Sequence, residues 1–401
     1  MRIWRVPYPK FGKGPGLERI SRIAERLGVD LAAFGADGAV IVGSNGKGST
    51  AAMTAALLSA RTPNVGLFTS PHLFRLNERF RIGDEDISDD DLEQHWDRVR
   101  AAAESIGLTA ELGGFEFLFL IAADWFVARG CAFTVWEAGI GGRLDPVRLI
   151  EARRVALTSL DLEHTQLLGA ALEDIARDKI EAAPKGARLF VSESCAPQRA
   201  GIEAHGLARG VSVEFVGKSE AAPLVGVHQK RNAAVALALA RDIAPEIHAE
   251  ALQRTRWPGR LEIIDEAPLT VIDVGHTPDA IAAALEGFQR LRGERPAVLV
   301  CGASVDKDHA AIIAALAPAF DRIVCVAARH KGAPAAEIAA HAADAHSGAD
   351  IAIAESLADA ATIARAKAGG AGAIYVAGGL FLAAEYKWVH LGRDPGLLAF
   401  F

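Results

Sequence analysis

The segment Ala39-Val-Ile-Val-Gly-Ser-Asn-Gly-Lys-Gly-Ser-Thr50 joins a short apolar run to a glycine-rich turn and then to an alanine-rich, helix-forming segment. A strand that delivers glycines to the start of a helix presents backbone N–H groups and the positive end of the helix dipole to an anion. Lys47 is placed to neutralise phosphate oxygens, and Ser49 or Thr50 to hold a magnesium ion. The segment therefore predicts a site for nucleotide phosphates.

The spacing of this turn departs from the usual P-loop, because two residues separate Gly43 from Gly46 and Gly48 follows Lys47 directly. An ordinary strand-to-helix turn is the alternative, and the glycines alone would favour it. The lysine and hydroxyls, with a strand before and a helix after them, favour phosphate binding. The expected nucleotide-binding residues are Gly43, Ser44, Asn45, Gly46, Lys47, Gly48, Ser49 and Thr50.

Length and composition limit the class of protein. A chain of 401 residues predicts two domains, and 51% hydrophobic with 23% charged residues is a globular composition. The net charge of −7 argues against a nucleic-acid partner. The sequence shows neither an apolar run long enough for a membrane span nor a signal-peptide core at its start, and we expect a cytoplasmic protein. Four scattered cysteines without CxxC spacing fit a reducing compartment: Cys131, Cys195, Cys301 and Cys325.

Short β-branched runs alternate with alanine-rich amphipathic segments, which predicts an α/β fold with parallel sheets. Strands are expected at Ala39–Gly43, Val65–Thr69, Ala132–Ala138, Val155–Leu160, Arg188–Ser192, Leu269–Val274, Ala297–Gly302, Arg322–Ala327 and Ala373–Ala377. Helices are expected at Gly16–Leu27, Ser49–Arg61, Asp89–Ile106, Phe115–Arg129, Leu172–Glu181, Arg231–Ile243, Asp279–Leu291, His309–Leu316, Ala335–Ala345 and Leu357–Ala368.

A basic stretch broken by proline and glycine, residues 254–260, cannot continue a helix. We place the junction between two domains there. The prediction is a first domain over residues 1–253, a linker over 254–260 and a second domain over 261–401.

Polar residues collect where the expected strands end, and this is where α/β sheets bind ligands. Glu137 ends a strand beside the P-loop strand, in the position of a magnesium-binding Walker-B carboxylate. A solvated strand end, or an ion pair with Arg143, remains an alternative for Glu137. His164 ends the next strand, although a lone histidine is more often a structural hydrogen-bonding residue. Asp273 and His276 follow a strand of the second half, and Lys179 alone would be interpreted as a solvated helix lysine.

Several segments together resemble the Mur ligase superfamily, and in particular its folylpolyglutamate synthase/dihydrofolate synthase branch. The P-loop segment Gly43-Ser-Asn-Gly-Lys-Gly-Ser49 resembles that of the branch, and further segments follow in the same order along almost the whole chain. These are Gly16-Leu-Glu-Arg-Ile20, Thr69-Ser-Pro-His-Leu73, Asn77-Glu-Arg-Phe80, Trp136-Glu-Ala-Gly-Ile-Gly-Gly-Arg-Leu-Asp145, Leu162-Glu-His164, Ile175-Ala-Arg-Asp-Lys179, His228-Gln-Lys-Arg-Asn-Ala233, Trp257-Pro-Gly-Arg-Leu-Glu262 and Asp306-Lys-Asp308.

The resemblance implies a P-loop NTPase-like Mur ligase central domain at the N-terminus and a smaller Rossmann-like α/β domain at the C-terminus. It also implies a reaction in which a substrate carboxylate attacks the γ-phosphate of ATP, and the amine of an amino acid then attacks the acyl phosphate. Such chemistry depends on positioning and charge neutralisation. The two domains would close on ATP and exclude water, because an acyl phosphate hydrolyses readily.

The resemblance also implies roles for single residues. Lys47 would hold the β/γ-phosphates and Ser49 one Mg²⁺, while Ser70, Glu137 and His164 would bind a second Mg²⁺. Lys179 matches a lysine that these enzymes carry as a carbamate, which replaces the solvated-lysine interpretation. Asn232 and Arg260 match residues that reach the nucleotide from the linker and the second domain, and Asp273 and His276 match positions that face the phosphates and the incoming amino acid.

Other positions depart from the pattern of the branch. Pro146, Val147 and Arg148 stand where Ala-Thr-Asn usually follows the Gly-Gly-Arg-Leu-Asp motif, in a region bordering the pterin end of the acceptor pocket. Thr277 replaces an asparagine, and Gly379 replaces a serine that helps bind glutamate. The ATP and Mg²⁺ positions match, whereas those facing the acceptor and the amino acid have changed.

Two classes of function follow. The first is an ATP-dependent amide ligase that joins L-glutamate to dihydropteroate or a folate, or that acts by the same mechanism on another carboxylate or amino acid. The second is a nucleotide-binding scaffold without catalysis, against which Lys47, Glu137, His164 and Lys179 count. The expected cofactors are ATP and Mg²⁺, the partners are small molecules rather than nucleic acid or membrane, and a monomer is expected by similarity.

Overall fold

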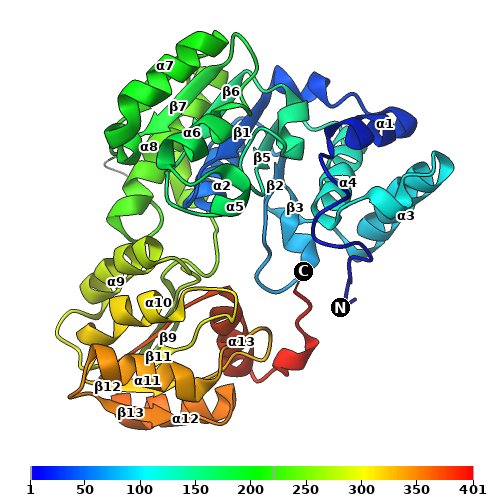
Figure 1. Ribbon diagram of the computed structural model, residues 1–401. Helices are drawn as coiled ribbons and strands as arrows, with labels where there is room; N and C mark the ends of the chain where they lie inside the picture. Colours follow the sequence, from blue (N-terminus) through cyan, green and yellow to red (C-terminus); the bar gives the residue numbers. More distant parts are fainter. Residues whose placement is uncertain (1, 220–221, 401) are drawn as a thin grey trace. The chain divides into compact units, whose positions relative to one another are not determined.

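The computed structural model describes residues 2–219 and 222–400, which form two compact units (Figure 1). Unit 1 contains the residues up to Pro223 together with His228–Arg256, and unit 2 contains Leu224–Val227 and Trp257–Phe400. The main division, between Arg256 and Trp257, lies inside the stretch 254–260. The short segment Leu224–Val227 belongs to unit 2 although the expected first domain includes it.

Unit 1 is built on an eight-stranded, mostly parallel sheet in which the P-loop strand β1 is central. The strand order is β4-β3-β2-β5-β1-β6-β7-β8, so β1 lies between β5 and β6. Only the edge pairs β2–β3 and β3–β4 are antiparallel among the pairings described for this sheet. The strands are β1 (Gly38–Val42), β2 (Val65–Phe68), β3 (Phe80–Ile82), β4 (Glu85–Asp86), β5 (Phe133–Glu137), β6 (Arg154–Leu157), β7 (Arg188–Ser192) and β8 (Ser212–Val216).

Helices cover this sheet, with α3 and α4 packed together in one region and α6 and α7 in another (Figure 1). The α-helices of unit 1 are α1 (Leu17–Leu27), α2 (Lys47–Leu58), α3 (Asp89–Ser105), α4 (Gly114–Ala128), α5 (Thr165–Leu168), α6 (Leu172–Ile180), α7 (Arg199–Arg209) and α8 (Val227–Ile243). The 3₁₀ helices are η1 (Ala32–Gly35), η2 (Leu76–Arg79), η3 (Thr109–Glu111), η4 (Pro146–Ile150), η5 (Glu193–Gln198) and η6 (Ala249–Arg254).

The core of unit 1 gives β1 a rigid position. All five residues of β1 are buried, as expected for a β-branched strand with parallel partners on both sides. Beside it, the buried ring of Trp136 on β5 packs against the rings of Phe34, Phe68, Phe119 and Phe126. Such a cluster of large side chains contributes much of the apolar burial, at about 25 cal/mol per Å². The loop after β1 therefore starts from a fixed point.

Unit 2 is a second α/β unit with a six-stranded sheet in the order β13-β12-β11-β14-β10-β9. Only β9 runs antiparallel among the pairings described for this sheet. The strands are β9 (Glu262–Glu266), β10 (Leu269–Ile272), β11 (Ala297–Cys301), β12 (Arg322–Cys325), β13 (Asp350–Ile353) and β14 (Ala373–Ala377). The helices are α9 (Pro278–Arg292), α10 (His309–Leu316), η7 (Ala317–Ala319), α11 (Ala335–Ala345), α12 (Leu357–Ala368), α13 (Leu380–His390) and η8 (Pro395–Leu397).

The predicted α/β class and the alternating order are confirmed, and the predicted elements agree with the observed ones to within a few residues. The prediction that the Glu137 strand lies beside the P-loop strand is also confirmed, since Ile41 on β1 is the register partner of Glu137 on β5. The sequence analysis missed five strands and three α-helices among the described residues. The strands are β3, β4, β8, β9 and β13, and the helices are α5, α7 and α13.

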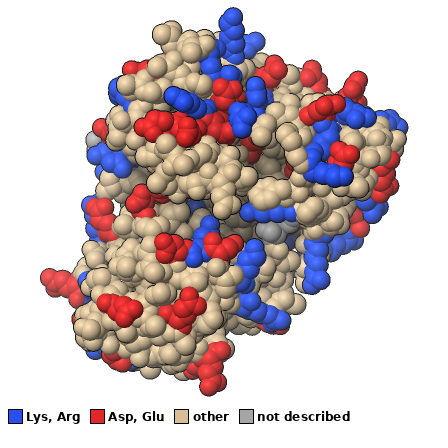
Figure 2. Space-filling model, viewed as in Figure 1, with Lys and Arg blue, Asp and Glu red and all other residues tan. Residues whose placement is uncertain are grey.

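The surface carries charges of both signs. Lys and Arg side chains are interspersed with Asp and Glu over the visible face of each unit (Figure 2). Among the described residues, no helix has both the length and the apolar character needed to cross a membrane. All four cysteines lie in described residues, and none of them forms a disulfide.

Candidate nucleotide and ligase site

The turn after β1 requires glycine at two positions. Gly43 has φ 147°, and a Cβ there would lie 2.0 Å from Thr158 Oγ1. Gly46 has φ 83°, in the left-handed region, and a Cβ there would lie 2.6 Å from Asn232 Oδ1. Larger residues are excluded at both places by backbone conformation and by space. The turn is therefore shaped for close approach, as the sequence predicts.

The end of β6 holds this turn in place. The Ser44 amide donates to Ser159 O over 3.0 Å, and the Asn45 amide donates to Ser159 Oγ over 2.7 Å. Thr158 Oγ1 donates to Asn45 O over 2.6 Å, and the Asp161 amide donates to Ser44 Oγ over 3.0 Å. These bonds fix the turn before any ligand binds, which lowers the entropic cost of binding.

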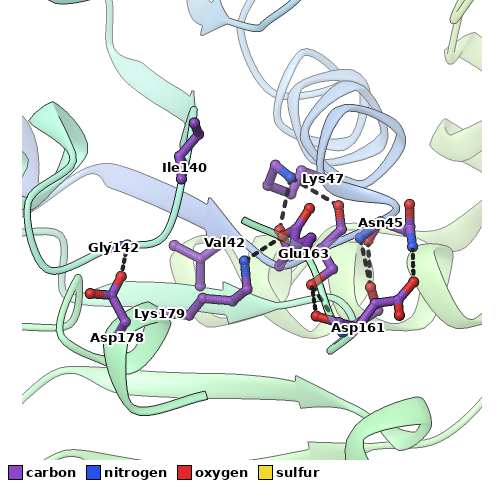
Figure 3. Close-up of polar contacts among 12 residues, drawn as sticks. Val42, Asn45, Lys47, Ile140, Gly142, Asp161, Glu163, Asp178 and Lys179 are labelled. Carbon is purple, nitrogen blue, oxygen red and sulfur yellow. Dashed lines mark hydrogen bonds and ion pairs between the residues drawn. The ribbon is translucent and has the colours of Figure 1, made fainter. Parts of the chain in front are cut away.

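Lys47 begins α2, and its amine lies over the turn. Its Nζ donates to Gly43 O over 2.8 Å and to Ser44 O over 3.1 Å (Figure 3). The first backbone N–H groups of α2 have no partners within the helix, and the helix dipole is positive at this end. A cationic side chain and a helix N-terminus thus point to the same place, which is suited to an anionic phosphate group.

Helix α8 contacts the first turn of α2. Asn232 on α8 donates through Nδ2 to Gln229 Oε1 over 3.0 Å, and Gln229 Nε2 lies 3.4 Å from Ser49 Oγ. Asn232 therefore belongs to a helix of unit 1 and not to a linker. Thr50 Oγ1 is buried with no hydrogen-bond partner among the described residues. Ser49 and Thr50 thus place two hydroxyl groups in the first turn of α2, directly after the P-loop lysine.

Glu137 at the end of β5 is buried, with 4% of its surface exposed, which excludes a solvated strand end. Its Oε2 accepts the Ser70 amide over 2.9 Å, so the structure brings these two predicted metal ligands together. Arg79 is buried nearby, and burial lowers the pKa of its guanidinium to about 10, although the charges of Glu137 and Glu78 act to raise it. Arg143, the alternative partner, instead donates through Nε to Asp178 Oδ1 over 3.2 Å.

Lys179 on α6 is not a solvated helix lysine. Its side chain is 1% exposed, and its Nζ donates to Glu163 Oε1 over 2.9 Å. Burial lowers the pKa of Lys179, as does the positive charge of Lys47, while Glu163 opposes the shift. Burial acts to raise the pKa of Glu163, but Lys47 and Lys179 outweigh it and the net pKa is lowered. Figure 3 shows Lys47 and Lys179 both beside Glu163.

His164 occupies a strained position at the start of α5. Its φ of 47° lies in the left-handed region, which costs a residue with a Cβ about 1–2 kcal/mol. The side chain is exposed and follows directly after Glu163. The structure places His164 directly after Glu163, the residue that accepts the hydrogen bond from Lys179.

Two carboxylates to which the sequence analysis gave no role support the same region. Asp145 Oδ2 accepts the Gly139 and Ile140 amides over 2.9 and 3.0 Å, and Oδ1 accepts the Val147 amide over 3.1 Å. Burial raises the pKa of Asp145 to about 6, against the effect of its three amide donors and of Lys47. Asp178 accepts the Gly142 amide over 3.0 Å (Figure 3). Both residues could have been found from the sequence, because Asp145 ends the Gly-Gly-Arg-Leu-Asp motif and Asp178 directly precedes Lys179.

Unit 2 carries the remaining predicted residues. Asp273 is buried after β10, accepting the Gly275 amide over 2.8 Å and the Leu261 amide over 3.1 Å. Burial raises the pKa of Asp273, although the charge of Arg260 opposes this. Arg260 Nε is itself buried without a hydrogen-bond partner among the described residues. His276 is exposed two residues before α9, and its Nδ1 lies 3.4 Å from Val274 O.

The positions that depart from the family pattern are also placed. Thr277 caps α9 by accepting the Ala280 amide over 3.3 Å, which an asparagine also does well. Gly379 precedes α13 with φ 157°, so a serine in this backbone conformation would be strained although a Cβ would meet no heavy atom within 4 Å. Pro146 and Val147 are buried in η4, and Arg148 Nη1 donates to Arg143 O over 2.9 Å.

Residues 259–380 match the family described as "Mur ligase, glutamate ligase domain". Over 409 aligned residues the chain is 33% identical to a probable bifunctional folylpolyglutamate synthase/dihydropteroate synthase of Halobacterium salinarum, covering 94% of this chain and 50% of that protein. The chain thus spans about half the length of this relative. It is 31% identical to the folylpolyglutamate synthase of Lacticaseibacillus casei, covering 71% of this chain and 75% of that protein.

Solved structures resemble the whole chain. A Mycobacterium tuberculosis folylpolyglutamate synthase complexed with ADP has a TM-score of 0.86 and 25% identity, and covers 96% of both chains. A bifunctional folylpolyglutamate synthase/dihydrofolate synthase with Mn, AMPPNP and L-glutamate bound has a TM-score of 0.83 and 26% identity, and covers 98% of this chain and all of that one.

Proposed function

The chain belongs to the folylpolyglutamate synthase family of the Mur ligase superfamily, and on this premise we propose that it is an ATP-dependent ligase that joins L-glutamate to a folate-type carboxylate. The observation that carries the proposal is the pair formed by buried Lys179 and partly buried Glu163, with the charge of Lys47 of the P-loop nearby. A nucleotide switch or scaffold has no need of a buried lysine next to its phosphate site. Its presence favours the ligase.

The nucleotide is held by the loop between β1 and α2. The N-terminal amides of α2 and the Lys47 ammonium bind the β- and γ-phosphates, and the contacts from Ser159 and Thr158 keep the loop in this shape. Asn232, beside Gly46, limits how far the nucleotide enters, because it already occupies the space next to that glycine. We assign Arg260 of unit 2 to the nucleotide as well, and its unpartnered buried Nε supports this role.

The oxygen groups of unit 1 fit a divalent cation. Mg²⁺ prefers hard oxygen ligands, and here a buried carboxylate, Glu137, lies at the end of β5 beside β1. The unpartnered buried hydroxyl of Thr50 and the hydroxyl of Ser49 are further oxygen groups at the start of α2. We assign Ser49 to one Mg²⁺ and Ser70, Glu137 and His164 to a second. When bound, the cation supplies charge neutralisation at phosphate oxygens.

Lys179 is proposed to carry a carbamate. Its amine nitrogen bonds to the carbon of CO₂, one proton is released, and the product is an anion. Two features support this: the burial of Lys179 and its lowered pKa, which together increase the share of neutral amine. In the carbamate form the ion pair with Glu163 is replaced, and the new negative charge faces Lys47.

The proposed reaction proceeds in two steps. A carboxylate oxygen of the acceptor forms a bond to the γ-phosphorus while the bond to the β-bridging oxygen breaks, and ADP leaves. The amine nitrogen of glutamate then bonds to the carbonyl carbon, phosphate leaves with its electron pair, and the amine loses a proton. The chain's contribution is to position the reactants and stabilise charge. We assign Asp273 and His276 to the phosphates and the incoming amino acid.

The acceptor is proposed to be dihydropteroate or a tetrahydrofolate, and a related carboxylate is the second candidate. A related carboxylate is favoured by one observation. Pro146 and Val147 are buried in η4 and Arg148 follows them, in the segment that borders the acceptor pocket in the family. We also propose that the protein acts in the cytoplasm, in keeping with its four thiols, and as a monomer.

A single assay tests this proposal. The chain is incubated with ATP and Mg²⁺, with pteroates, folates or unrelated acids, and with each common amino acid, and ADP release and product mass are measured. We expect ADP release to require both an acid and an amine, and the product to be the acid extended by glutamate. ADP release that is independent of either partner would contradict the ligase.

A further inference from the structure

Two neighbouring helices of unit 2 carry a cluster of metal-ligating side chains to which the proposed ligase site assigns no role. His309 begins α10, and Glu337 and His341 lie one turn apart on α11. The two helices pack against each other within unit 2 (Figure 1). Among the described residues, one ligand atom from each of these three side chains lies within 4.8 Å of the others. We call these three residues the α10–α11 cluster.

The distances suit one ion. Glu337 Oε1 lies 2.8 Å from His309 Nδ1 and 3.9 Å from His341 Nε2. Ligands about 2.0–2.1 Å from a tetrahedral zinc are separated by roughly 3.4 Å, a value between the two observed ones. The ligand atoms of His309 and His341 also lie within 4.8 Å of each other, and we expect side-chain rotations to bring all three atoms to one centre.

The chemistry of the cluster selects the metal. Two imidazoles and one carboxylate form a borderline donor set that suits Zn²⁺ and its neighbours Co²⁺, Ni²⁺ and Cu²⁺ rather than Mg²⁺. The spacing of Glu337 and His341, four residues apart on α11, places both on one face of that helix. The partial exposure of Glu337 and His341 gives an ion access and leaves a fourth position to water.

We propose that His309, Glu337 and His341 form a binding site for a divalent transition-metal ion of the zinc class, which links α10 to α11. The site is separate in its residues from the oxygen ligands assigned to Mg²⁺, and it does not depend on the ligase activity. Because the ion binds only the folded arrangement, it is expected to stabilise unit 2.

The test uses the full-length chain freed of metals by a chelator and then held in excess Mg²⁺, so that oxygen sites are occupied. Zn²⁺ is titrated calorimetrically, and Co²⁺ is titrated while its visible d–d absorption is recorded. We expect one ion per chain, with imidazole-type coordination. In His341→Ala and Glu337→Gln, affinity is expected to fall by at least about 10- to 100-fold.

His346→Ala is the matched control, because His346 lies at the end of the same helix and pairs instead with Asp321, Nε2 to Oδ1, at 3.6 Å. Its zinc affinity is expected to equal that of the parent chain. Circular dichroism checks that each variant is folded, and His341→Ala is the deciding variant because His341 is partly exposed and its loss should disturb the fold least. Absence of zinc binding in the parent chain, or equal binding in His341→Ala, would overturn the site.

Discussion

The Nζ of Lys179 lies 2.9 Å from Oε1 of Glu163 in a position where the lysine is almost completely buried. Such a pair is costly to form, since each charge loses its hydration, and its contribution to stability is small or negative. Lys47 adds a second positive charge nearby. A buried lysine kept in this environment indicates a functional rather than a stabilising role.

Replacing Lys179 with alanine is expected to abolish ligation and to allow partial rescue by added short carboxylic acids. The reason is that a free carboxylate can occupy the place of the proposed carbamate. Turnover is measured as phosphate release with and without acetate or formate. Lys185→Ala is the control, since Lys185 is exposed in the same region of unit 1, and it should retain full activity without any effect of acid.

The carbamate itself is tested with ¹³CO₂. We expect a carbamate carbon signal in the parent chain that disappears in Lys179→Ala. A variant that acids do not rescue, together with a parent chain that takes up no label, would exclude this modification while leaving the P-loop assignment in place.

Replacing Lys47 with alanine is expected to lower turnover by about 100- to 1,000-fold or more, because the ammonium neutralises phosphate charge. The free energy of unfolding should change by about 1 kcal/mol or less, since the side chain is partly exposed and water replaces its contacts with Gly43 O and Ser44 O. The rate of ADP production measures turnover, and chemical denaturation measures the free energy of unfolding. Near-normal turnover would mean that this loop does not bind the nucleotide.

Gly46→Ala and Gly186→Ala form a matched pair. Both glycines are left-handed, with φ of 83° and 84°, and each substitution should cost about 1–2 kcal/mol of stability for the backbone alone. A Cβ at 186 meets no heavy atom within 4 Å, whereas one at 46 lies 2.6 Å from Asn232 Oδ1. We therefore expect only Gly46→Ala to lose affinity for ADP, measured calorimetrically. Equal affinities in the two variants would show that the loop does not contact the nucleotide.

The raised pKa of Asp145 leads us to expect that the free energy of unfolding depends on pH. Its folded-state pKa of about 6 lies above the ordinary 3.8, so the folded chain holds this proton more tightly than the unfolded chain. The stability it contributes is full below about pH 3.8 and is lost as the pH rises through about 6, a fall of up to about 3 kcal/mol. Denaturation across this range should show the fall in the parent chain.

Asp145→Asn should remove that part of the pH slope and, because asparagine has one acceptor oxygen, cost about 1–3 kcal/mol through lost amide contacts. Asp84→Asn, at an exposed turn of unit 1, is the control and should leave the slope unchanged. An unchanged slope in Asp145→Asn would place the titrating group elsewhere.

The central part of each sheet was predictable because its signals are local. In β1 an apolar run is followed directly by glycines, and in β14 five buried residues follow one another without interruption. The edge strands β9 and β13 were missed because half-exposed, partly polar residues resemble a loop. Helix α13 follows two glycines and contains large aromatic residues, both of which weaken a helix prediction.

The site was predictable to the same extent. Glu137 was assigned correctly to the strand beside β1, because parallel α/β sheets place carboxylates there. The burial of Lys179 and the position of Asp145 depend on how the chain returns between β5, β6 and α6, which the residues alone do not specify. The resemblance to a family, rather than any local pattern, drew attention to Lys179.

The most direct measurement follows oxygen from the acceptor to phosphate. The chain is given ATP, L-glutamate and a pteroate or folate in which both oxygens of the reacting carboxylate are ¹⁸O, and the released phosphate is analysed by mass spectrometry. An acyl phosphate requires one ¹⁸O atom to appear in each phosphate formed with product. Product with unlabelled phosphate would contradict activation of the carboxylate by ATP.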